Sequence, residues 1–230
     1  MADQKYIMDN PVKLQLSAEE MELVSNTEWI LTKHRIIKKV YEMFGEINEM
    51  MKNEIVNWDH LFPENLKYRG GKISKGDSYQ KLPYVILDYP SFFVKNNIFT
   101  VRTMFWWGNF FSITLHLSGY HKTRFVNNNQ ELLSFLKKNN FFICVSEEEW
   151  QHHFNEENYA IATTITDAVY SQIMRQDFFK VAKKLPLIRW DNAYDFIMES
   201  FREILELLEI NFQGDKKDLL PGSPIVGSGL

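Results

Sequence analysis

The chain has 230 residues, of which 45% are hydrophobic and 24% are charged, and its formal net charge is -4. These values are ordinary for a globular domain, and the length suffices to bury a core that needs neither disulfides nor metals for stability. The mild acidity argues against a general nucleic-acid binder or a binder of anionic membranes, because such surfaces carry an excess of Lys and Arg.

The cysteine usage and the N-terminus indicate a reducing compartment. Cys144 is the single cysteine and therefore cannot form an internal disulfide. It lies in the apolar run 141–145, so we expect a buried and inert thiol. The first residues lack the apolar region of a signal peptide, and no apolar run reaches the ~18 residues of a membrane span. We therefore expect a cytoplasmic protein that does not associate with membranes.

The N-terminal part of the chain is predicted to be helical after an irregular arm over residues 1–16. Ser17 and Glu20 have the spacing of a capping box, which predicts that a short helix begins there. A second helix is expected from about Glu28, because apolar residues recur along one helical face. The basic residues of this helix fall mainly off that face, and we interpret them as solvated rather than phosphate-binding: Lys33, Arg35, Lys38 and Lys39.

Residues 57–81 are expected to form a surface loop rich in Gly and Lys. They do not form a phosphate-binding P-loop, because Lys72 is followed by Ile73 rather than by Ser or Thr. From Leu82 onward the apolar period changes to two, which predicts strands. The expected strands cover residues 82–89, 97–105, 110–117 and 141–145, with a short helix at 130–138 before the last of them.

The C-terminal part is predicted to be mostly helical. Ser146 and Glu149 repeat the capping-box spacing at the start of a short segment that contains two histidines. Apolar residues at every third or fourth position predict a helix over residues 156–184, against which a Thr-rich run weighs, and Pro186 would end it. A final helix over about 192–210 has the clearest amphipathic pattern in the chain.

The C-terminal tail, residues 214–230, is too rich in Pro and Gly to continue a helix. We expect it to be extended and flexible. A docking peptide is the alternative interpretation, since four of its residues are unusually apolar for a free terminus: Leu219, Leu220, Ile225 and Val226.

The aromatic stretch 97–117 is predicted to form a β-hairpin. A three-residue loop at 107–109 would pair Phe105 with Phe111 and would align one apolar face across both strands. A two-residue loop would instead place a basic side chain among apolar ones. We therefore predict the three-residue loop, with Asn109 in the left-handed conformation that such loops often contain.

This register leaves a mixed polar face on the hairpin, which is the candidate site. Arg102, Thr114 and His116 lie on it, and Asp88 of the preceding strand would meet Arg102 in a three-stranded meander. An Asp–Arg pair beside His and Thr would recognise a small polar ligand or perform acid–base chemistry. The alternative is a sheet face held by cross-strand pairs. Two further candidates at the turn serve either ligand contact or hairpin packing: Trp106 and Trp107.

The sequence predicts no metal and no cofactor. His116 and His121 are five residues apart, whereas His152 and His153 are adjacent, and neither spacing is that of a helical metal-binding pair. The nucleophile motifs of hydrolases are also missing from the sequence. These observations leave open whether the protein is an enzyme.

Three stretches resemble conserved hypothetical proteins of bacteria: "NTEWILTKHRIIKKVYEMFG", "MFWWGNFFSITLHLSG" and "WQHHF". The resemblance covers most of residues 17–210 and implies a bacterial origin. That family has no assigned activity, so the resemblance transfers no functional residue to this chain.

These patterns predict an α+β fold, in which an antiparallel meander of about four strands packs against N- and C-terminal helices. A single domain is expected over residues 17–213. The leading hypothesis is a non-catalytic binding or protein-interaction domain that uses the aromatic hairpin and the mixed face. The second is an enzyme that acts on a small polar substrate through Asp88, Arg102 and His116. The third is a carrier body that presents its tail to a partner. The oligomeric state stays open.

Overall fold

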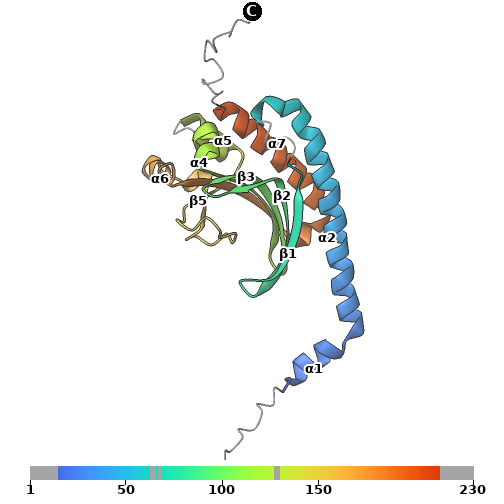
Figure 1. Ribbon diagram of the computed structural model, residues 1–230. Coiled ribbons are helices and arrows are strands. Elements are labelled where there is room, and N and C mark those ends of the chain that lie inside the picture. Colours follow the sequence, from blue (N-terminus) through green and yellow to red (C-terminus); the bar gives the residue numbers. More distant parts are fainter. Residues whose placement is uncertain (1–14, 63–65, 67–68, 127–129, 213–230) are drawn as a thin grey trace, which may run out of the picture. The chain divides into compact units, whose positions relative to one another are not determined.

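The computed structural model describes residues 15–62, 66, 69–126 and 130–212 (Figure 1). Contacts divide the chain into two compact units, one up to Val40 and one from Tyr41 onward. Most of the predicted N-terminal arm, and the whole of the predicted tail, lie outside the described residues.

The first unit consists of a short helix and the start of a long one. The short helix, α1 (Ala18–Ser25), begins at the predicted capping box, where the Ser17 hydroxyl accepts from the Glu20 amide at 3.1 Å and the Glu20 carboxylate accepts from the Ser17 amide at 2.7 Å. Asn26 ends α1, and its side chain then accepts from a first-turn amide of α2 (Thr27–Glu54) at 2.9 Å. Both predicted helices are confirmed, and α1 buries none of its residues.

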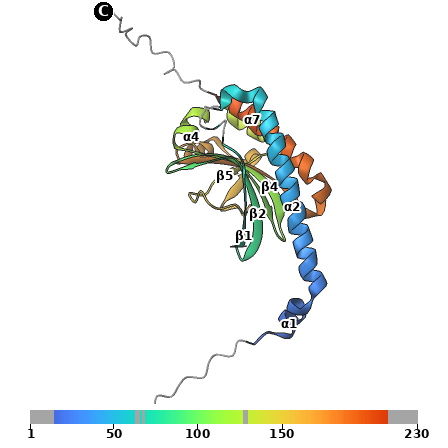
Figure 2. The ribbon, with the colours of Figure 1, turned by 45° about the vertical axis from the view of Figure 1, so that its right-hand side comes forward.

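The second unit is built around one strongly curved antiparallel sheet (Figures 1 and 2). The sheet has seven strands in the order β1-β2-β3-β4-β7-β5-β6, so the prediction of about four strands was wrong in number, although the meander itself is present. The strands are β1 (Lys72–Tyr79), β2 (Leu82–Val94), β3 (Asn97–Trp106), β4 (Phe110–Ser118), β5 (Phe142–Cys144), β6 (Tyr159–Ile161) and β7 (Phe178–Pro186).

The edge strand β1 was wrongly predicted as a loop. It pairs with β2 along most of its length, with an irregularity between Gly76 and Tyr79. Its Lys, Ser and Gly content suits a strand whose outer edge is open to solvent, and the same composition imitates a loop. Strand β2 also runs past Tyr89, where Pro90 suggested an end, and its pairing with β3 resumes at Phe92.

The helix predicted over residues 156–184 is also wrong. The region contains β6, η2 (Ala162–Thr164), α6 (Asp167–Ile173) and most of β7. Strand β7 lies between β4 and β5, and its first five residues are buried. A strand that is covered on both faces shows no apolar alternation, so its period does not separate it from a helix.

The helix α7 (Ala193–Asn211) lies along the outer face of the sheet and contacts β4 and β7 (Figure 1). It confirms the predicted C-terminal helix, and Phe201, Ile204 and Leu208 on its apolar stripe are fully buried. In the part of the chain that the structure describes, no helix combines the length and the apolar character that a membrane span needs. Other helices among the described residues include η1 (Ile55–Leu61), α4 (Gly119–Phe125), α5 (Gln130–Lys138) and η3 (Leu187–Asn192).

The predicted register of the aromatic hairpin is confirmed. Phe105 lies opposite Phe111, and the apolar residues that follow pair across β3 and β4 on the outer, helix-covered face. The loop has three residues, but Gly108 rather than Asn109 takes the left-handed conformation, with φ of 71°. Glycine adopts this conformation without the steric cost of a side chain. Asn109 instead donates from its side chain to the Trp107 carbonyl at 2.8 Å.

Candidate functional site

The mixed face of the hairpin forms part of the inner face of the sheet. Asp88 lies opposite Arg102, which in turn lies opposite Thr114, on the adjacent strands β2, β3 and β4. Arg102 donates to Asp88 twice, from Nε to Oδ1 at 2.7 Å and from Nη2 to Oδ2 at 3.0 Å. The two side chains are only 13% and 7% exposed. The predicted Asp–Arg contact is therefore confirmed.

Two further groups extend this polar surface toward the end of the sheet. His116 on β4 lies opposite Lys180 on β7, and both are buried. Sequence reasoning missed Lys180 because its strand was assigned to a helix. The two lysines that follow it in β7 also did not indicate that Lys180 is buried. The polar floor, as we name it, consists of Asp88, Arg102, Thr114, His116 and Lys180.

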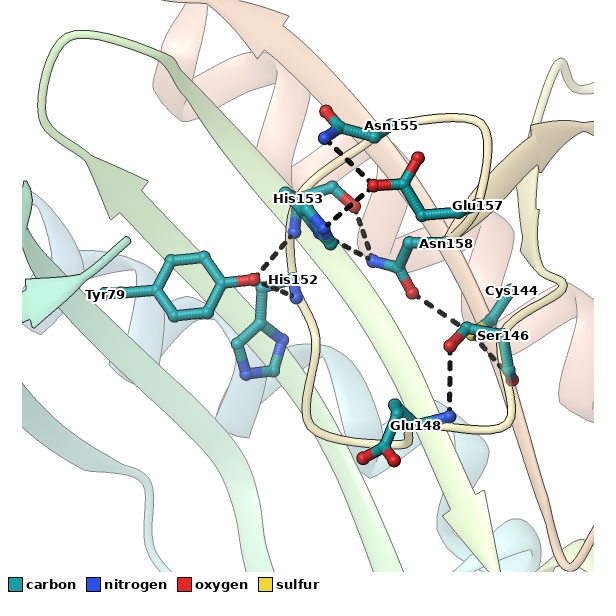
Figure 3. Close-up of polar contacts among 9 residues, drawn as sticks. All are labelled: Tyr79, Cys144, Ser146, Glu148, His152, His153, Asn155, Glu157 and Asn158. Carbon is teal, nitrogen blue, oxygen red and sulfur yellow. Dashed lines mark hydrogen bonds and ion pairs between the residues drawn. The ribbon is translucent and has the colours of Figure 1, made fainter. Parts of the chain in front are cut away.

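Residues 145–158, which connect β5 to β6, lie over the polar floor on the inner side of the sheet (Figures 1 and 3). We call them the covering segment. The helix start suggested by Ser146 and Glu149 does not occur here. The Ser146 hydroxyl accepts from the Glu148 amide at 3.0 Å, two residues along the chain, and this bond closes a turn.

Lys180 anchors the backbone of the covering segment. Its ammonium donates to the carbonyls of Glu149 at 2.7 Å and Gln151 at 2.6 Å. Burial lowers the pKa of Lys180 to about 8, so the group is still mostly charged at neutral pH. The described hydrogen bonds of this ammonium go to carbonyl oxygens rather than to a carboxylate, and its charge also lies 5.4 Å from the centre of the Tyr159 ring.

A hydroxyl group on the edge strand provides a second anchor. The Tyr79 hydroxyl accepts from two successive backbone amides, that of His152 at 2.7 Å and that of His153 at 3.1 Å (Figure 3). The chain that carries Tyr79 was predicted to be a loop, so no sequence signal connected it with the histidines. Strand β1 thus positions the covering segment from one side, while β7 holds it from below.

His116 of the polar floor and His152 of the covering segment make their contacts as neutral side chains. Burial is the main cause that lowers the pKa of His116 and of His152 below the ordinary value. A neutral His116 donates from Nε2 to the Glu149 carboxylate at 3.3 Å, and this bond lowers the pKa of Glu149. Because Arg102 is always a donor, His152 accepts through Nε2 from its Nη1 at 3.0 Å.

The far end of the covering segment is held by a buried amide (Figure 3). Asn158 is fully buried and donates from its side chain to the His153 carbonyl, while its Oδ1 accepts from the Cys144 thiol at 3.6 Å. Burial raises the pKa of Cys144, which keeps it a thiol rather than a thiolate. The prediction of a buried cysteine is confirmed.

The two tryptophans of the turn pack within the sheet. Trp106 is buried on the inner face, with its ring edge-on to Tyr79 at 5.2 Å and to Phe110 at 5.3 Å. Trp107 is half-buried against Phe105, at 5.4 Å between ring centres. The tail residues proposed for docking lie outside the described residues: Leu219, Leu220, Ile225 and Val226.

A cleft of about 920 Å³ opens where the covering segment leaves the sheet. Glu149 and Trp150 belong both to its wall and to the contacts of the polar floor, because the Trp150 ring lies 5.3 Å from His116. Trp150 is 47% exposed. Other walls come from the ends of β3, β4 and β7, from α6 and from the chain that follows it. The charged residues of its lining are Glu147, Glu148, Glu149, Asp177 and Arg175.

The arrangement separates a closed polar layer from an open cleft. In the floor, Asp88 accepts two bonds from Arg102, and the covering segment accepts one further bond from Arg102 and two from Lys180. In the cleft, carboxylates and an indole ring reach the surface. Within the described ranges, no three His, Cys, Asp or Glu side chains are placed to hold a metal ion.

Comparisons with protein-family models, with curated proteins and with solved structures found no match for this chain. The resemblance to conserved hypothetical proteins of bacteria therefore stays a prediction.

Proposed function

We propose that the protein is a non-catalytic binding protein whose ligand site is the cleft, and that the polar floor is the support of that site. The observation that carries the proposal is the double role of Glu149 and Trp150. Both line the cleft, and both are fixed from behind by contacts with His116. A binding site needs groups that face the ligand and a rigid layer that holds them in place.

The chemistry of the lining favours a cationic group as ligand. Four carboxylates and one guanidinium line the cleft. His116 is neutral at pH 7, because burial lowers its pKa, so its bond to Glu149 leaves the carboxylate charge uncompensated. Aromatic faces attract cations, and Trp150 offers an exposed indole beside these carboxylates. An ammonium or guanidinium group, on a small molecule or on a partner's side chain, fits this combination.

A catalytic use of Asp88, Arg102 and His116 has less support. Asp88 and Arg102 are bonded to each other, and His152 occupies another nitrogen of Arg102. A substrate would reach these groups only after the covering segment had left, and Lys180 and Tyr79 both hold that segment. The binding hypothesis needs no such movement.

The test is a matched titration of the full-length protein followed by NMR. Butylammonium and butylguanidinium carry the favoured group, while butanol and butyrate have a chain of similar size without it. We expect the indole signal of Trp150 to shift with the cations, with a dissociation constant of about millimolar for such small probes. Equal or stronger shifts with butyrate, or no shift at Trp150, would overturn the proposal.

A pair of variants makes the titration specific. Glu148→Gln with Asp177→Asn removes two exposed carboxylates from the lining and should weaken the binding of both cations about tenfold. Glu206→Gln is the matched control, because Glu206 is exposed on α7 and does not line the cleft. If the control weakens binding as much as the cleft variant does, the cations bind the acidic surface in general rather than this site.

A further inference from the structure

The first unit exposes an unusual number of large apolar side chains. Each of seven apolar residues of this unit is between 39% and 59% exposed, and α1 buries none of its residues. Large apolar side chains that are exposed in this number are typical of a surface that binds a partner. These residues are Leu16, Met21, Leu23, Val24, Trp29, Ile30 and Leu31.

The charges of the first unit are segregated by sign along the sequence. The acidic arm, residues 17–28, contains four glutamates and no basic residue. The basic arm, residues 33–39, contains three lysines and one arginine and no acidic residue. One ion pair, between Glu28 and Arg35 at 2.6 Å, joins the two arms within the chain. The acidic side chains are Glu19, Glu20, Glu22 and Glu28, and the basic ones are Lys33, Arg35, Lys38 and Lys39.

We propose that the occupant of this surface is a second copy of the chain, paired antiparallel about a two-fold axis near Trp29. In that arrangement the acidic arm of each copy lies against the basic arm of the other. Trp29, Ile30 and Leu31 lie at the centre, and the exposed apolar residues of α1 accompany the acidic arm. A two-fold interface is self-complementary, which means that the same surface of each copy provides both sides of every contact. A surface with an acidic arm before the centre and a basic arm after it meets this requirement. A parallel pairing would place acidic arm against acidic arm.

The positions on the helices agree with this pairing. Leu31 and Lys38 are seven residues apart and so share one side of α2, at a spacing of about 10 Å along its axis. The chain leaves helical geometry at Asn26, so α1 departs from the axis of α2 and can cross the basic arm of the partner. The apolar centre supplies most of the stability, while the charges select the orientation of the pair.

The experiment measures the mass of the full-length protein by analytical ultracentrifugation. We expect a dimer at low salt, with a dissociation constant that rises severalfold when salt reaches about 0.5 M, because exposed charges are screened. Leu31→Asp, at the centre, should yield monomers. Circular dichroism of each variant checks that the helices persist.

Two charge-reversed variants distinguish a second copy from every other occupant. Glu19→Lys with Glu22→Lys cancels the net charge of the acidic arm, and Lys38→Glu with Lys39→Glu cancels the net charge of the basic arm. Each variant alone should be monomeric or weakened at least tenfold, because its altered arm has lost the net attraction to the partner's charged arm. An equimolar mixture should form a heterodimer, since the unchanged basic arm then meets the unchanged acidic arm and the introduced lysines lie against the introduced glutamates.

A chain that stays monomeric at about 100 µM in low salt contradicts the proposal, because a specific interface should be populated at that concentration. A mixture that fails to restore the dimer also contradicts it, provided that both variants keep their helices. A dimer that forms unchanged in both variants rejects the antiparallel pairing. None of these outcomes depends on the cleft, so this proposal and the proposed function are tested separately.

Discussion

Arg102 and Asp88 form a two-point ion pair across neighbouring strands, and the pair is enclosed by the sheet below and by the covering segment above. The geometry matches the planar guanidinium to both carboxylate oxygens. A buried pair of this kind contributes little net stability compared with apolar residues of similar size, but each partner depends strongly on the other.

Arg102→Met should therefore lower the free energy of unfolding by about 3–5 kcal/mol, because it leaves the Asp88 carboxylate buried without a partner. The double variant Asp88→Leu with Arg102→Met should lose much less than Arg102→Met alone. Urea unfolding of the two variants measures both values. Losses that simply add from the single to the double variant would show that the two side chains act independently.

Tyr79→Phe should loosen the covering segment without unfolding the sheet. The substitution removes the one oxygen that accepts from the amides of His152 and His153. An unpaired buried amide costs about 1–3 kcal/mol, so hydrogen exchange at these two amides should accelerate at least tenfold. Exchange at the amides of β3 is the internal reference. Acceleration of both sets together would instead indicate global destabilisation.

His121 should make the protein sensitive to mild acid. It is buried against Phe92 and Phe99, and burial lowers its pKa to about 4. At a pH below about 6.5, which is the ordinary pKa of histidine, His121 binds a proton in the unfolded chain but not in the folded chain. The contribution of the buried, neutral His121 to the stability of the fold is therefore fully present above about pH 6.5 and is lost as the pH falls toward 4.

For His121 this loss amounts to about 2 kcal/mol between pH 7 and pH 5, at about 1.4 kcal/mol per pKa unit. His116 and His152 act in the same direction, because burial lowers their pKa values as well. In His121→Leu, the decline in the free energy of unfolding between these pH values should be smaller by about that amount. An equally steep decline in the variant would assign acid sensitivity to other groups.

Gly119→Ala should destabilise the junction between β4 and α4. Gly119 has a φ of 56°, and a Cβ atom at this position would overlap the carbonyl oxygen of Asn96. The left-handed conformation alone costs a side-chain residue about 1–2 kcal/mol, and the overlap adds to it. Gly45→Ala on α2 is the control, since its added Cβ would meet nothing within 4 Å. A thermal unfolding midpoint that falls equally in both variants would contradict this expectation.

The hairpin was predictable in detail because its two faces differ sharply. Shifting the pairing of β4 by one residue would have moved Phe111 and its apolar neighbours to the face of the sheet that carries Arg102. The need to bury these apolar side chains on one face therefore selected the register. The contact between Asp88 and Arg102 followed from the same register. Local patterns were sufficient here because strands that are consecutive in the chain are also neighbours in the sheet.

The rest of the site depends on contacts between residues that are distant in sequence. Lys180 enters the polar floor because β7 pairs with β4, and no periodic pattern announces that pairing. Tyr79 meets the covering segment from the other edge of the same surface. The capping-box spacing at Ser146 predicted a helix start wrongly, because a serine hydroxyl can accept from a nearby backbone amide in a turn as well as at the start of a helix.

The central position of β7 has a consequence for the order of folding. Strands β1 to β4 follow one another by short connections, whereas β7 pairs with β4 only after the chain between Ser118 and Phe178 has formed a closed loop. Contacts that close long loops form late because the entropy of closure opposes them. The covering segment lies within this loop, so we infer that the hairpins assemble first and that the layer over Arg102 and His116 is among the last parts to consolidate.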